Sequence, residues 1–182
     1  MARDTEILNA AADLFRKRGF AAVGVDEIGR TAGVTGPAIY RHFKGKDDIL
    51  GVLFDEGMDE ITRVTSATFD DPREELRYLA QQHAAHVMHN PRLASIWLKE
   101  GRSLAEPHRR RYLRRASKYI ERWTEVLERC YPDSTADQRD VASRTAIGAL
   151  NSVDDWPRVL RTDEHVEWLA DIVVGGLSAT LS

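Results

Sequence analysis

The chain has 182 residues, of which 42% are hydrophobic and 30% are charged, and its formal net charge is −3. This length is enough for two small domains with cores of their own, and the composition excludes a disordered chain. The single cysteine, Cys130, excludes an intrachain disulfide framework, and without a signal peptide or a long apolar run we expect a cytoplasmic protein that has no membrane partner.

The charge is divided unevenly along the chain. Residues 1–46 contain eight Lys or Arg and five Asp or Glu, a net charge of +3, whereas the remaining residues sum to −6. A nucleic-acid-binding module concentrates basic residues in this way. We therefore expect the N-terminal end to contact a nucleic acid.

The N-terminal segment predicts one amphipathic helix. Gly19 closes the helix, and Phe20 is placed to pack back against it. The apolar residues that recur at helical spacing are Ile7, Leu8, Ala11, Leu14 and Phe15. This helix would cover the module that follows.

Residues 25–43 predict two short helices joined by a tight turn. In the first helix, Ile28 and Ala32 lie four residues apart on one apolar stripe. Gly33 follows, and glycine readily takes the left-handed conformation that a chain reversal needs. This pattern is typical of a helix-turn-helix motif.

The second helix of this motif begins at once and is very short. Thr35 is a favourable N-cap residue, and the fixed φ of Pro37 suits the first helical turn. Ile39 and Phe43, four residues apart, can pack inward. The side chains left to contact DNA are Tyr40, Arg41 and His42.

At this motif the chain resembles the tetracycline-repressor (TetR) family of bacterial transcription regulators. The resemblance covers residues 5–54 and rests on Val25, Ile28, Gly29, Ala32, Gly33, Val34, Thr35, Ile39, Tyr40, His42, Phe43, Lys46 and Leu50. The chain departs from the family pattern twice. Gly29 replaces the usual alanine at a cost of about 1 kcal/mol in helix propensity, and Gly24 lacks the hydroxyl with which a Thr or Ser there can reach a phosphate.

The resemblance implies an all-α, nine-helix, two-domain fold. Residues 1–46 would form a three-helix DNA-binding domain, and residues 47–182 a helical domain that binds a ligand and dimerises. The implied partners are a double-stranded DNA operator, a small-molecule effector and a second copy of the chain, with no cofactor. The DNA-binding residues would be Thr35, Gly36, Pro37, Ala38, Tyr40, Arg41, His42 and Lys46. Of these, the family pattern assigns phosphate contacts to Tyr40, His42 and Lys46, and the others would face base edges.

Capping residues and prolines at expected helix ends predict six further helices. One opens at Lys46 and is amphipathic through Ile61, and others begin at Asp71–Pro72 and Asn90–Pro91. A long helix runs from Pro107 to near Cys130. The last two are expected over residues 134–155 and 162–180.

The last two helices contain small residues that allow close backbone approach, and their apolar residues spread around more than one face. A helix with two apolar faces needs two partners, so we expect one face to pack in the core and the other against a second copy. The predicted interface residues are Ala142, Ala146, Ala149, Leu150, Val153, Ile172 and Gly176. The alternative is a core entirely within one chain.

A basic run extends over residues 109–122. Its seven Lys and Arg side chains fan across most of a helix surface, which is typical of a solvated face paired with acidic neighbours. The alternative is that some of these arginines attract an anionic group, such as the phosphates of a coenzyme A thioester, at the mouth of a ligand cavity.

His83, His86 and His89 recur every third residue, and this spacing spreads them too widely around a helix to hold one metal ion. We therefore expect no metal site. Together with several aromatic residues they could line an apolar cavity, although such a stripe also suits a plain core. The predicted ligand-binding residues are His83, His86, Trp97, Tyr112, Tyr119, Trp123, Asn151 and Trp156.

The sequence contains none of the common catalytic motifs, so we do not expect an enzyme. The function that these features predict is a ligand-responsive DNA-binding regulator. It would most simply repress a palindromic operator as a dimer and be released by a small hydrophobic or acyl-CoA-like effector. The alternative is a small-molecule-binding or scaffold protein whose helix-turn-helix no longer reads DNA.

Overall fold

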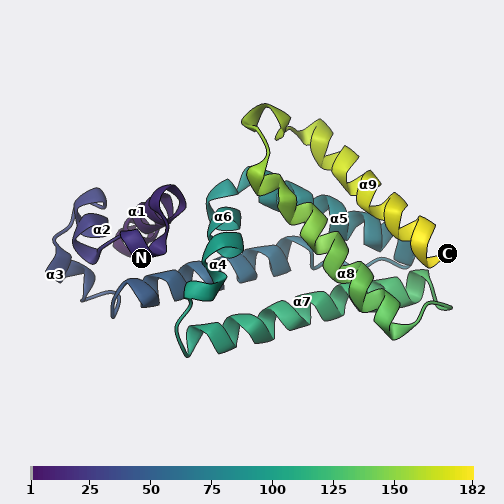
Figure 1. Ribbon diagram of the computed structural model, residues 1–182, viewed down its shortest axis with the longest axis horizontal. Helices are drawn as coiled ribbons and strands as arrows, with labels where there is room; N and C mark the ends of the chain where they lie inside the picture. The colour runs from purple at the N-terminus through teal and green to yellow at the C-terminus, as the bar shows by residue number, and fades with distance from the viewer. Residues whose placement is uncertain (1) are drawn as a thin grey trace. The chain divides into compact units, whose positions relative to one another are not determined.

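The computed structural model describes residues 2–182, leaving aside the side chains of residues 2, 91–93, 95, 154 and 155. All regular structure in this part of the chain is helical (Figure 1). The α-helices are α1 (Ala2–Arg18), α2 (Val25–Thr31), α3 (Gly36–Ile39), α4 (Lys46–Val64), α5 (Pro72–His89), α6 (Pro91–Glu100), α7 (His108–Cys130), α8 (Ala136–Asn151) and α9 (Asp163–Leu181). Short 3₁₀ turns are η1 (Phe20–Ala22), η2 (Gly101–Ser103), η3 (Ser152–Asp155) and η4 (Arg158–Leu160). The predicted all-α fold of nine helices is confirmed for these residues.

The chain forms two compact units. The first runs through Met58 and also includes Arg92–Leu113, and the second comprises Asp59–Pro91 and Arg114–Ser182. The predicted domain boundary, after residue 46, coincides with the start of α4, whereas the two units divide within α4. No helix among the described residues is long and apolar enough to cross a lipid bilayer.

The core of the first unit is formed by large apolar side chains from α1 to α4 and from α6. Ile7 and Phe15 of α1 are 0% and 1% exposed, and Ile28 and Ile39 of the helix-turn-helix are both 0% exposed. Burying side chains of this size contributes roughly 1.5–3 kcal/mol each. The short helices α2 and α3 are therefore held by packing on α1 and α4, because helices of this length are not stable alone.

The turn between α2 and α3 needs its glycines. Gly33 has φ of 69°, a left-handed conformation that favours glycine, and the N–H of Val34 donates to the Gly29 carbonyl at 2.8 Å. A Cβ on Gly29 would lie only 3.0 Å from the carbonyl oxygen of Val34. This close approach is a structural reason for glycine at a position where the family usually has alanine.

The structure tests two predictions about helix ends, and the second needs correction. Thr35 occupies the N-cap position of α3 as predicted, and its carbonyl accepts from the Ala38 N–H at 2.9 Å, but its side chain makes no capping hydrogen bond. The helix expected to extend to residue 155 ends at Asn151. There the Ser152 hydroxyl donates to the Ala149 carbonyl at 2.7 Å, and the chain tightens into η3.

In the second unit, α9 packs on α5 and on α8 (Figure 1). Leu79 of α5, Trp123 of α7 and Leu150 of α8 are each 0% exposed. Close packing of these faces leaves the opposite faces of α8 and α9 available to solvent.

Candidate DNA-binding face and effector-domain sites

The short helix α3 divides its residues between the core and solvent as the sequence predicts. Ile39 is 0% exposed and Phe43, which follows the helix, is 7% exposed. Thr35, Pro37 and Arg41 are exposed, and Tyr40 is 60% exposed even though it is a large aromatic residue. Gly36 and Ala38 are half-buried. We call the surface formed by residues 35–42 outside the core the reading face.

Several polar groups on the reading face have no protein partner. Among the described residues, no hydrogen bond or ion pair involves the Thr35 hydroxyl, the Tyr40 hydroxyl or the Arg41 guanidinium. An exposed guanidinium beside an exposed phenol can contact phosphate or a base edge without first breaking an internal contact.

His42 and Lys46 differ from these residues because their polar atoms contact the protein. His42 Nδ1 lies 2.5 Å from a carboxylate oxygen of Asp4 on α1. Lys46 Nζ donates to the carbonyls of Phe20 at 3.0 Å and Val23 at 3.1 Å, and lies 4.4 Å from the centre of the Phe20 ring. Their assignment to DNA phosphates stays a prediction.

Glu100 has a structural role that no pattern in the sequence indicates. At the end of α6, its carboxylate accepts the Phe20 N–H at 2.8 Å and the Ser103 hydroxyl at 2.8 Å. The turn η1, which connects α1 to α2, is therefore held through its N–H group by Glu100 and through its carbonyls by Lys46. Both contacts join residues far apart in sequence, so no local pattern indicates them.

In the second unit, three predicted ligand-binding residues form a buried polar chain. His83 Nδ1 lies 2.9 Å from the Tyr119 hydroxyl, and His83 Nε2 lies 3.1 Å from Oδ1 of Asn151. If Nε2 donates to the Asn151 oxygen, Nδ1 is left to accept from Tyr119, which is the pattern of a neutral imidazole. These three side chains therefore link α5, α7 and α8.

Burial fixes the charge state of this polar chain. Desolvation lowers the pKa of His83 to about 4, despite the opposing effect of the hydrogen bond that His83 donates to Asn151. Desolvation also raises the pKa of Tyr119 to about 12, although contacts from Trp123 and Thr65 act in the other direction. At neutral pH the side chains of His83, Tyr119 and Asn151 are therefore all uncharged.

The other predicted ligand-binding residues are distributed more widely. The Trp123 ring is fully buried, with its centre 6.4 Å from that of His83, and His86 is buried with a pKa lowered by desolvation. The Trp156 carbonyl accepts from Arg161 at 2.9 Å. Trp97 and Tyr112 lie in the first unit, where their rings surround Phe54 at centroid distances of 6.4 and 4.8 Å.

His89, the third histidine of the series, pairs with Asp163 at 3.0 Å instead of joining the other two. Among the described residues, no three His, Cys, Asp or Glu side chains are grouped closely enough to hold a metal ion.

Four of the seven basic residues in the run, Arg110, Arg111, Arg115 and Arg122, pair with acidic residues, as the first interpretation predicts. Arg111 forms a two-bond pair with Asp55, and Arg115 pairs with Asp59. Arg122 and Arg129 both contact Glu75, which is 1% exposed, at 3.1 and 2.5 Å. Burial alone would raise the pKa of Glu75, but its bonds from Arg129 and the Phe69 N–H, together with the Arg122 charge, lower it overall.

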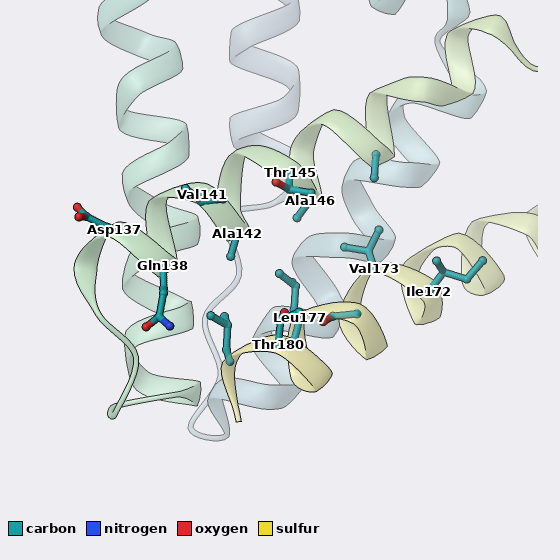
Figure 2. A pocket seen from close by; sticks show the side chains of 13 residues that line it. Asp137, Gln138, Val141, Ala142, Thr145, Ala146, Ile172, Val173, Leu177 and Thr180 are labelled. Carbon is teal, nitrogen blue, oxygen red and sulfur yellow. Dashed lines mark hydrogen bonds between the residues drawn. The ribbon is translucent and has the colours of Figure 1, made fainter.

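An apolar groove lies between the outer faces of α8 and α9 (Figure 2). It encloses about 620 Å³, and Ile172, which lines it, is 56% exposed. The lining residues are Asp137, Gln138, Val141, Ala142, Thr145, Ala146, Ala149, Ile172, Val173, Gly176, Leu177, Thr180 and Leu181. Five of the seven predicted interface residues line this groove. The other two, Leu150 and Val153, are 0% exposed and belong to the core of the second unit.

Comparison with protein families shows two matches that together cover most of the chain. Residues 7–53 match the family model described as bacterial regulatory proteins, tetR family. Residues 70–177 match the tetracyclin repressor-like C-terminal domain.

Two curated relatives are transcription factors. The transcriptional activator FasR of Mycolicibacterium smegmatis is 31% identical over 48% of this chain and 42% of its own. The transcriptional repressor KstR2 of Rhodococcus jostii is 29% identical over 69% of this chain and 64% of its own. The chain thus spans less than two thirds of the length of these relatives.

Solved structures share the fold at low sequence identity. PfmR of Thermus thermophilus superimposes with a TM-score of 0.83 at 24% identity, over 92% of this chain and 93% of that one. AibR, solved with isovaleryl coenzyme A and operator DNA, also gives a TM-score of 0.83, at 22% identity over 96% and 97% of the two chains.

Proposed function

The chain belongs to the TetR family of bacterial regulatory proteins, and from this premise we propose that it is a DNA-binding transcription regulator with no enzymatic activity. It acts on DNA and therefore in the cytoplasm. Residues 1–46 read the DNA, and residues 47–182 bind an effector and dimerise.

The observation that supports DNA binding most directly is the reading face. Thr35, Tyr40 and Arg41 flank the short helix α3, and their exposed side chains have no hydrogen-bond or ion-pair partner among the described residues. In the proposal, Tyr40, His42 and Lys46 contact phosphates, while Thr35, Gly36, Pro37, Ala38 and Arg41 face base edges in the major groove.

The groove between α8 and α9 supports a homodimer. Most of the side chains that line it are apolar, and Ala142, Ala149 and Gly176 would let the helices of a second copy approach closely. A dimer is required functionally, because one four-residue helix contacts too few bases for useful specificity. Two copies related by a two-fold axis would read a palindrome.

The effector is proposed to bind in the second unit and to release the DNA, so the protein acts as a repressor. Repression is the activity named for KstR2, the relative with the longer alignment, and AibR offers a precedent for an acyl-CoA effector. The neutral His83–Tyr119–Asn151 chain suits an effector whose buried part is uncharged. Such an effector lowers DNA affinity only by its differential affinity for the two conformations.

Two measurements test the proposal. Gel-shift titration with the DNA upstream of the protein's own gene should give a complex that random DNA of equal length does not displace. Native mass spectrometry of freshly purified protein should show a dimer and should reveal a retained small molecule. Equal affinity for upstream and random DNA would refute a regulator that reads sequence.

A further inference from the structure

We propose that Asp26 of α2 reads DNA directly, by accepting a hydrogen bond from the amino group of a cytosine in each operator half-site. This inference rests on the proposed function, because it assigns a specificity residue to the same DNA-binding unit. Asp26 is not one of the residues on which the resemblance to the family rests.

The geometry places the Asp26 carboxylate beside the start of the reading helix. If Gly36, the first residue of α3, carried a Cβ, that atom would lie 2.0 Å from Oδ1 of Asp26. The carboxylate therefore occupies the space that a side chain at position 36 would fill. Position 36 is flanked by the exposed residues Thr35 and Pro37, so the carboxylate adjoins the reading face.

The Asp26 carboxylate is exposed and makes no hydrogen bond or ion pair with any described residue. The next acidic residue of the same helix turn behaves differently, because Glu27 is paired with Arg18. Asp26 thus has no structural partner that would explain its orientation. Its two oxygens remain available to a donor outside the chain.

The reading face otherwise has few groups that distinguish bases. Pro37 and Ala38 have no polar side-chain atom, and Gly36 has no side chain. Thr35 and Arg41 provide a hydroxyl and a guanidinium, of which the guanidinium only donates. The Asp26 carboxylate would add a group that only accepts, whereas the Thr35 hydroxyl can either donate or accept.

The chemistry of DNA limits what this acceptor can bind. Phosphates repel a carboxylate, and guanine and thymine present only acceptors among their polar groups in the major groove. Cytosine presents its N4 amino group there, and Asp or Glu is a known type of partner for it. Adenine also has an amino group, but its neighbouring N7 acceptor would face the second carboxylate oxygen. Cytosine is therefore the preferred base.

The test compares base preferences. Duplexes with a randomised centre are selected by the full-length protein and by Asp26→Asn and Gly36→Ala variants, and the bound pools are sequenced. The unaltered protein should enrich a palindrome with one cytosine per half-site that Asp26→Asn no longer prefers, losing about 5- to 10-fold in discrimination. Because an Asn side chain pairs well with adenine, the preference should move toward adenine.

Gly36→Ala provides a second route to the same result. The backbone at position 36 is helical, so alanine suits it, and the added methyl group should displace the carboxylate while Asp26 itself is retained. The same cytosine position should lose its preference. Asp47→Asn, which removes an exposed carboxylate from the first turn of α4, is the charge control and should leave every base preference unchanged.

The outcomes separate this inference from the function on which it rests. A defined palindrome that is identical for the unaltered protein and for Asp26→Asn would overturn the role of Asp26 and leave the proposed function standing. Enrichment of adenine by the unaltered protein at the affected position would overturn the assignment to cytosine. Failure of the unaltered protein to enrich any sequence would overturn the proposed function and this inference together.

Discussion

Tyr40 and Arg41 are neighbours on the reading face, yet we expect their removal to have different consequences. Tyr40→Phe should weaken binding about equally on all sequences, because a phosphate contact contains no base information. Arg41→Ala should relax the preference at one or two operator positions, each by about 1–3 kcal/mol if the guanidinium binds guanine through two bonds. Titration of both variants on operator and random DNA checks this, and equal losses for Arg41→Ala on both would remove its base-reading role.

Lys46 is expected to contribute to salt dependence even though its ammonium contacts carbonyls. Those carbonyls are neutral, so they do not cancel the positive charge of Lys46. Lys46→Ala should therefore reduce the slope of log affinity against log salt by about one per half-site. Lys118→Ala, an exposed lysine of the second unit, is the control and should leave the slope unchanged. An unaltered slope for Lys46→Ala would restrict this lysine to holding η1.

His83 should make the folded protein sensitive to acid. Its pKa is about 4 in the folded chain, against about 6.5 when unfolded, so between these values only the unfolded chain binds the proton. The contribution of His83 to the free energy of unfolding is therefore fully present above about pH 6.5. It is lost as the pH drops toward 4, and the loss is about 3 kcal/mol in all. Urea unfolding of His83→Gln over this range should show a flatter dependence on pH. Tyr119→Phe removes a hydrogen bond but not the titration, so it should lower stability without flattening the curve.

The residues of the two candidate sites differ in how far sequence could predict them. The exposure of Tyr40 and Arg41 and the burial of Ile39 follow from helical spacing, and the structure confirms them. The Glu100 contact to η1 and the approach of Asp26 to Gly36 depend on how separate elements pack. No local pattern in the sequence contains that information.

At the scale of elements, caps and glycines were sufficient to predict where most helices begin. The predicted start at Asp71–Pro72 is confirmed, because the Asp71 carboxylate accepts the Arg73 N–H at 2.8 Å at the beginning of α5, and Gly19 closes α1 at φ of 78°. The end of α8 was missed because η3 continues the same apolar spacing with tighter hydrogen bonds. A separate pattern concerns the faces of α8 and α9. Their small residues correctly indicated that both helices have a second apolar face. They could not indicate that Leu150 and Val153 pack within the chain, because spacing alone does not distinguish the two faces.

The groove between α8 and α9 can be tested at Gly176. A Cβ on this glycine would meet nothing within 4 Å, so Gly176→Glu should fold as a single chain. In a dimer, the same side chain would bury an unpaired charge against the second copy. The variant should therefore sediment as a folded monomer with unchanged helical circular dichroism and should bind the operator only with the weak affinity of a single half-site.

Gly175→Glu is the matched control, because Gly175 is equally unhindered but does not line the groove. It should remain dimeric. Ala146 is a less suitable position for this test. It is only 3% exposed, so a charge there would disturb the packing within one chain. A Gly176→Glu protein that stays dimeric and active would show that these helices are not the interface.

For the molecule as a whole, the proposal requires that two reading faces act together on one operator. The affinity of a dimer for a palindrome exceeds that of one half-site only when both faces meet the same side of the DNA at a matching distance. Inserting about five base pairs between the half-sites turns the second by roughly half a helical turn, onto the opposite side of the duplex. The binding energy of the second half-site is then lost, although the DNA still contains the bases of both half-sites.

The prediction is that the operator with this insertion binds no more tightly than an operator with one half-site scrambled. Gel-shift titration of the three duplexes at one salt concentration measures it, since affinities at different salt concentrations are not comparable. The Gly176→Glu monomer serves as the reference, because it should bind all three duplexes with the same weak affinity. If the insertion left the affinity of the unaltered protein unchanged, the two copies would be binding their half-sites independently, and the rigid dimer would be wrong even if α8 and α9 form an interface.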